Sequence, residues 1–170
     1  MKEDLSLKRD FFLINRIADK DLDFTRIFGN VNPVYLEIGS GRGEFIVAKS
    51  RQNLQINFLG IDVKDKRIKT ILRKLDLQEN SNVRLLRLFV DQNLERIIPA
   101  ASLERIYILH PDPWPKRKHH KNRLIQDLFL DVLSRLLIPS GDIMISTDHR
   151  EYAWWIKGIF AGREDFCLES

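Results

Sequence analysis

The sequence predicts an α/β protein built on a mostly parallel sheet with helices on both faces. Short apolar runs, typical of strands, alternate along the chain with segments whose apolar residues recur every three or four positions, typical of helices. This alternation favours a parallel sheet. A glycine-rich turn follows the first apolar run, where such sheets bind ligands. The 170 residues, 44% of them hydrophobic, suffice for one domain with a sizeable core.

The first 32 residues are expected to form a helical extension ahead of the main domain, which would span residues 33–170. This extension is polar apart from an apolar cluster at residues 11–14 and Ile17. Asn30-Val-Asn-Pro33 then breaks the helical pattern, because asparagine and proline favour turns.

Five strands and four helices are expected after this break. The strands are expected at residues 34–38, 58–62, 83–90, 105–109 and 142–146. The helices are expected at residues 44–51, from Ile68 to Leu75, from Leu124 to Leu136 and from Tyr152 to Ile159. Pro139-Ser-Gly141 is expected to end the third helix.

Polar residues follow the ends of these strands. Parallel sheets bind ligands outside the carboxyl ends of their strands, so these residues are expected to meet at one edge. They are Glu37 and Gly39, Asp62, residues 89–91, Asp112 and Asp148.

The turn Gly39-Ser-Gly-Arg-Gly43 lies between an expected strand and an expected helix, as a nucleotide-binding turn does. Its last glycine comes one residue too early for the dinucleotide fingerprint, and Glu37 would repel a pyrophosphate. A carboxylate there suits a cationic ligand instead. Asp62, at the end of the next strand, can accept hydrogen bonds from ribose hydroxyls. The alternative is a plain strand-to-helix turn with exposed acids.

Positive charge is concentrated in the fourteen residues from His110 to Arg123. They hold five cations and one acid, which equals the net charge of +4 of the whole chain. A focused basic segment is typical of a surface that binds a phosphate backbone, although a solvated loop would look the same.

Composition excludes several other classes of protein. No apolar run approaches the roughly 18 residues of a membrane span, and the start lacks the apolar core of a secretory signal. A single cysteine, Cys167, excludes an internal disulfide, and four scattered histidines do not predict a metal site. A cytoplasmic location is the default expectation.

Two groups of motifs resemble a known family. Leu36 to Phe45 and Gly60-Ile-Asp62 resemble the cofactor motifs of class I methyltransferases that use S-adenosylmethionine, which have a Rossmann-like sheet. Pro111-Asp-Pro-Trp-Pro-Lys116, its basic continuation and Ser146-Thr-Asp148 resemble the tRNA (guanine-N7-)-methyltransferases in particular. The resemblance implies methyl transfer to N7 of a guanosine in the tRNA variable loop.

The resemblance also implies roles for individual residues. The cofactor would be held by Glu37, Gly39 and Gly41 at its methionine and adenosine parts, and by Asp62 at its ribose. Asp112 would lie between the cofactor and the target base, as the catalytic residue. The tRNA would be contacted by Lys116, Lys118, Lys121, Arg123 and Asp148.

The sequence departs from the family pattern in two places. Phe89 occupies the position where the family carries an acid beside adenine, so the nearest acid, Asp91, is the expected substitute. The family also continues into two more strands with a Thr-x-Tyr-Glu substrate motif, whereas this sequence ends at Ser170 without them. We therefore expect a sheet truncated at its C-terminal strands.

Two alternative functions remain open on the sequence. Asp112-Pro-Trp-Pro115 partly resembles the motif of methyltransferases that act on exocyclic amines of nucleic acids. A non-catalytic tRNA-binding remnant of the family would also keep the fold and the basic segment.

Overall fold

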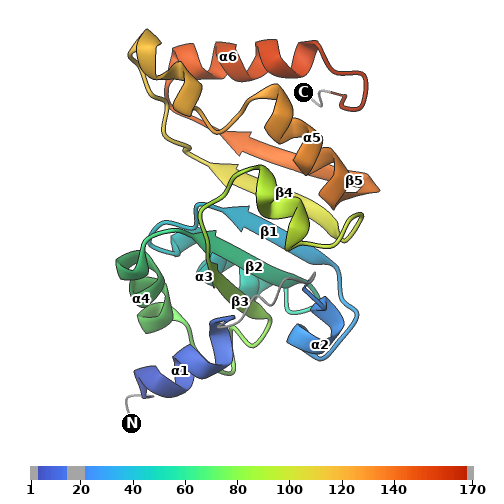
Figure 1. Ribbon diagram of the computed structural model, residues 1–170. Helices are drawn as coiled ribbons and strands as arrows, with labels where there is room; N and C mark the ends of the chain where they lie inside the picture. The colour runs from blue at the N-terminus through green and yellow to red at the C-terminus, as the bar shows by residue number, and fades with distance from the viewer. Residues whose placement is uncertain (1–3, 15–21, 168–170) are drawn as a thin grey trace.

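The computed structural model describes residues 4–14 and 22–167 (Figure 1). Its sheet has the order β3-β2-β1-β4-β5, and all four pairs of neighbouring strands are parallel. The strands are β1 (Val34–Ile38), β2 (Asn57–Asp62), β3 (Val83–Arg87), β4 (Leu103–Leu109) and β5 (Leu137–Ser146). The expected parallel sheet is confirmed.

Helices cover both faces of this sheet. The α-helices are α1 (Leu5–Phe12), α2 (Phe24–Phe28), α3 (Glu44–Gln52), α4 (Asp65–Lys74), α5 (Asp127–Leu136) and α6 (Arg150–Ala161), and the 3-10 helices are η1 (Gln92–Arg96) and η2 (Arg117–Asn122). Successive strand residues point to opposite faces, so Phe58 of β2 packs in the cluster with α1, α3 and α4. The adjacent Leu59 packs in the cluster with α5 and α6.

Two strands differ from their expected limits. β3 ends at Arg87, so residues 88–90 form a loop. β5 begins at Leu137, directly after α5, and the Pro-Ser-Gly stretch at 139–141 lies inside it as an irregularity where the register to β4 shifts. Proline lacks the N–H that a regular ladder needs, which explains why pairing is interrupted there.

The segment before β1 packs onto the sheet. α1 contacts α4 and β3, and the backbone N–H of Ile14 donates to the carbonyl of Leu85 in β3 at 2.9 Å. Ile17, part of the expected apolar cluster, falls outside the described residues. None of the helices in the described part of the chain is both long and apolar enough to cross a membrane.

The carboxyl ends of all five strands meet at one edge of the molecule, to which the arrowheads in Figure 1 point. We call it the carboxyl edge. The loops after β1, β2, β4 and β5 leave the sheet there, and these loops carry most of the predicted site residues.

Candidate active site

The glycine turn joins β1 to α3 and is anchored to β2. Gly39, Gly41 and Gly43 all have positive φ angles, of 78°, 55° and 79°. The backbone N–H groups of Gly39 and Ser40 donate to the carbonyl of Ile61 at 2.8 and 3.0 Å. A Cβ added at Gly39 would meet no atom within 4 Å, so the space beside that position is open. The turn is therefore anchored to β2 and leaves space for a ligand beside Gly39.

Gly43 has a second constraint, because its backbone lies close to Ile71 of α4. A Cβ at Gly43 would lie 2.8 Å from Ile71 Cγ1, whereas a Cβ at Gly29, whose φ of 73° is similar, would meet nothing. We expect Gly43→Ala to lower the free energy of unfolding by about 2–4 kcal/mol, from left-handed strain plus overpacking. Gly29→Ala should cost only the strain, about 1–2 kcal/mol. Chemical denaturation of both variants measures the difference, and equal losses would contradict the steric contribution.

Glu37, the fourth residue of β1, is a buried acid next to this turn. Its side chain is 4% exposed, and its Oε2 atom has no hydrogen-bond partner. Burial raises the pKa of Glu37 to about 7, an effect that the negative charges of Asp62 and Glu44 reinforce. A buried acceptor without a donor is costly, so Glu37 is suited to receive a cationic or hydrogen-bonding group from a ligand.

Asp62, at the end of β2, is also buried, but its carboxylate has partners. Oδ2 accepts from the backbone N–H of Gly41 at 3.0 Å, and Oδ1 accepts from that of Lys64 at 2.9 Å. Arg67 of α4 pairs with the same carboxylate at 3.3 Å. The structure thus brings two predicted cofactor residues, Gly41 and Asp62, into contact. The sequence reasoning missed Arg67, although it lies only five residues after Asp62, in the first turn of α4.

Asp91 and Phe89 lie in the segment that follows β3. The carboxylate of Asp91 caps η1, because it accepts hydrogen bonds from Asn93 through the backbone N–H at 2.9 Å and through Nδ2 at 3.1 Å. The Phe89 ring is 69% exposed. An exposed aromatic ring at this edge can stack on a planar ligand, whereas Asp91 would first have to share its carboxylate with the cap. The role of Asp91 stays a prediction.

Asp112 and Asp148 lie on two loops that the structure holds together. The backbone N–H of His110 donates to the carbonyl of Ser146 at 2.9 Å, and His110 Nδ1 lies 4.0 Å from Asp148 Oδ1. Both carboxylates are exposed. His110 and Trp114 have φ angles of 51° and 44°, which are uncommon outside glycine and occur often at functional sites.

The lysines of the basic segment face solvent. Lys116, Lys118 and Lys121 are exposed on and beside η2, and the ring of Trp114 stacks on His119 at 5.8 Å between centroids. With Arg117, which is also exposed, four exposed cations within six residues provide a surface that a phosphate backbone can contact. Within the described residues, no group of three or more histidine, cysteine, aspartate or glutamate side chains is placed to hold a metal ion.

Arg123 corrects the sequence prediction of a tRNA contact. The residue is only 2% exposed. Its Nε donates to the carbonyl of Pro113 at 2.9 Å, and its guanidinium carbon lies about 5 Å from the ring centroids of both Tyr152 and Trp155 (5.1 and 4.9 Å). Glu151 pairs with it at 3.4 Å. A guanidinium enclosed by α6 in this way holds the loop that carries Asp112 and is not available to a phosphate.

A family model and several known proteins are similar to this chain in sequence. A protein family described as "Putative methyltransferase" matches residues 31–169. The tRNA (guanine-N(7)-)-methyltransferase of Syntrophotalea carbinolica is 36% identical over 88% of this chain and 64% of its own length. The tRNA (guanine-N(7)-)-methyltransferase of Buchnera aphidicola is 42% identical over 81% of this chain and 57% of its own length. The chain thus spans less than two thirds of either relative.

Solved structures agree on the fold. The 16S rRNA methyltransferase KamB aligns with a TM-score of 0.61, covering 89% of this chain and 78% of its own, at 15% sequence identity. Such low identity supports the α/β methyltransferase architecture alone. The family match covers most of the chain, including the glycine turn and the loops that hold Asp112 and Asp148. The chain therefore belongs to this family of putative methyltransferases.

Proposed function

We propose that this chain transfers the methyl group of S-adenosylmethionine to N7 of a guanosine in tRNA. The observation that carries the proposal is the placement of the Asp112 loop and its exposed lysines after β4, next to β1, whose end bears Glu37 and the glycine turn. The names of its relatives support the same substrate. A tRNA substrate would place the protein in the cytoplasm.

The residues present fit this cofactor. The turn leaves open space beside Gly39, and Glu37 offers its buried Oε2 atom, which has no hydrogen-bond partner, to the cationic methionine end of the cofactor. Asp62 lies at the end of the neighbouring strand, where it would meet the ribose if the ligand shares or displaces the contact of Arg67. The bound cofactor supplies a methyl group on a positively charged sulfur.

Guanine N7 carries a lone pair and no proton, so its methylation needs no general base. A bond forms between N7 and the methyl carbon, the bond from that carbon to sulfur breaks, and its electron pair stays on sulfur. The product base becomes positively charged. The protein's work is therefore to align the reacting atoms, which can supply roughly 7–11 kcal/mol of the barrier, and to stabilise the new charge.

The exposed carboxylates are placed for the second task. Asp112 can accept hydrogen bonds from the Watson–Crick edge of guanine and stabilise the cation that grows on the ring. Asp148, held near the Asp112 loop through His110, can contact the same nucleotide. Arg123 is buried and positions the Asp112 loop through its hydrogen bond to Pro113, so it makes no contact with the substrate.

The direct test is transfer of a labelled methyl group to unmodified tRNA, followed by nucleoside analysis. We expect N7-methylguanosine as the product. A methylated exocyclic amine would favour the alternative enzyme class. Binding of tRNA and cofactor without transfer would identify a non-catalytic remnant, and either result would overturn the proposed reaction.

The lysines of η2 should act through phosphates. We expect Lys118→Ala combined with Lys121→Ala to weaken tRNA binding and to reduce the slope of log affinity against log salt by about 1–2, because each phosphate contact contributes about 0.7–0.9. Arg26→Ala combined with Arg96→Ala removes two exposed cations from α2 and η1, which precede β1 and β4 in the chain, and serves as the matched control. If the two double variants had equal salt slopes, the lysines would contact solvent and not the phosphates of the tRNA.

A further inference from the structure

A second concentration of positive charge lies on α4 and the residue before it. Residues 64–74 hold six cations against one acid, a net charge of +5, which exceeds the net charge of +4 of the segment from His110 to Arg123. The charge of the chain outside that segment averages to zero, which conceals this cluster. The cations are Lys64, Lys66, Arg67, Lys69, Arg73 and Lys74.

Some of these cations are paired and others are not. Lys69 pairs with Asp65 at 2.7 Å, Lys74 with Glu44 at 2.6 Å, and Arg67 with Asp62. Among the residues that the structure describes, exposed Lys64, Lys66 and Arg73 form no ion pair. At least three full positive charges therefore face solvent on α4 and its N-cap residue.

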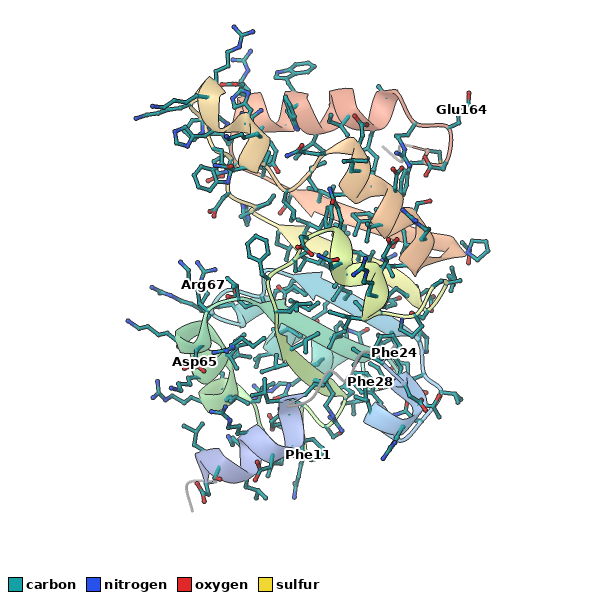
Figure 2. All side chains as sticks on the ribbon, in the orientation of Figure 1. Phe11, Phe24, Phe28, Asp65, Arg67 and Glu164 are labelled. Atoms are coloured by element: carbon teal, nitrogen blue, oxygen red, sulfur yellow. The ribbon has the colours of Figure 1, made fainter. Side chains whose placement is uncertain are left out.

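The start of α4 lies at the carboxyl edge, because Lys64 follows the last residue of β2 by two positions. The loop after β4 leaves the same edge, with β1 between the two strands. Strands are spaced by about 4.8 Å, so the ends of β2 and β4 are roughly 10 Å apart. Figure 2 shows nitrogen-tipped side chains of α4, among them Arg67, projecting from the same side of the molecule as those of η2. The cofactor turn thus lies between two basic surfaces.

These cations are not placed to stabilise the helix. A helix has a partial positive charge at its N-terminus, so Lys64 before the first turn and Lys66 and Arg67 within it are unfavourable for α4. The position of these cations is explained if a negatively charged partner binds over them.

We propose that Lys64 and Lys66 form a second phosphate-binding surface, and that the RNA substrate spans the cofactor turn from the η2 lysines to α4. The proposal rests on the proposed function, because it concerns the same nucleic acid. A polynucleotide carries a charge every few ångströms and can bridge a gap of this size. Contacts on both sides of the turn would fix the target nucleotide between them.

The test is tRNA binding by the double variant Lys64→Glu and Lys66→Glu, measured over a range of salt concentrations. We expect affinity to fall at least tenfold at low salt and the salt slope to decrease by about 1–2. Acids suit the start of a helix, so this variant should fold at least as well as the wild type, and thermal unfolding checks that. Arg26→Glu combined with Arg96→Glu changes the net charge equally away from the carboxyl edge.

The outcomes separate this surface from the proposed reaction. The α4 surface would be overturned if the Lys64 and Lys66 variant lost no more tRNA affinity and no more salt slope than the Arg26 and Arg96 control. This outcome does not depend on whether the wild type transfers methyl groups. A wild type that binds tRNA but transfers nothing would contradict the reaction, while the affinities of the variants would still decide on α4. A wild type that does not bind tRNA would overturn both.

Discussion

Replacing Asp112 with alanine is expected to lower kcat for tRNA methylation by about 10²–10³-fold. Removing a single preorganised group that stabilises charge in a transition state typically costs this much, about 3–4 kcal/mol. Asp112 is exposed and lies in the loop between β4 and η2, so its loss should leave the fold unchanged. Single-turnover methyl transfer at saturating tRNA and cofactor measures the chemical step.

Two further variants make this experiment specific. Asp112→Asn keeps the size and one acceptor oxygen but removes the charge, so its rate should lie between those of the wild type and the alanine variant. Glu164→Ala removes an exposed acid on the loop after α6, at the opposite end of that helix from Asp148 (Figure 2), and should leave the rate unchanged. An Asp112→Ala enzyme with the wild-type rate would show that Asp112 does not act on the reacting base.

Glu37→Gln is expected to weaken binding of S-adenosylmethionine by roughly 30-fold or more. Truncating one partner of a buried charge pair costs about 2–5 kcal/mol, and Glu37 is a buried carboxylate whose Oε2 atom has no hydrogen-bond partner. Glu79→Gln removes the charge of an exposed carboxylate between α4 and β3, so it is the matched control and should change the affinity little. Calorimetric titration of the three proteins measures the affinities.

The pH dependence of the same binding follows from the raised pKa of Glu37, about 7. A cationic ligand requires the ionised carboxylate, so wild-type affinity should fall by about tenfold for each pH unit below 7. The affinity of Glu37→Gln should not follow this profile. A wild type that binds S-adenosylmethionine equally well at pH 5.5 and pH 8 would contradict the role of Glu37.

Stability without ligand should change in the opposite direction. The folded-state pKa lies above the ordinary value of 4.5, so the folded protein holds this proton more tightly than the unfolded chain. The destabilising effect of Glu37 therefore develops as pH rises from about 4.5 to about 7 and is constant above that. Glu37→Gln should be more stable than the wild type at pH 8, by up to about 3 kcal/mol, and should lose that advantage near pH 4.5.

The sequence determined the parallel sheet and the edge where its ligand site lies. Strands buried on both faces require continuous apolar runs, and all five runs proved to be strands. Since parallel strands end at one edge, the residues after them had to meet there, as the contact between Gly41 and Asp62 shows. The limits of β3 and β5 were less predictable, because pairing with a neighbour decides where a strand begins and ends.

Only the tertiary structure decided which charged side chains are buried. In the sequence, Arg123 looks like the lysines before it, yet Tyr152, Trp155 and Glu151 of α6 enclose it. The same uncertainty applied to Glu37 and Asp62, which lie near the carboxyl ends of neighbouring strands. The Oε2 atom of Glu37 finds no donor, whereas both oxygens of Asp62 do. Removing a charge from water is costly unless distant segments supply partners, and a sequence does not show which segments those are.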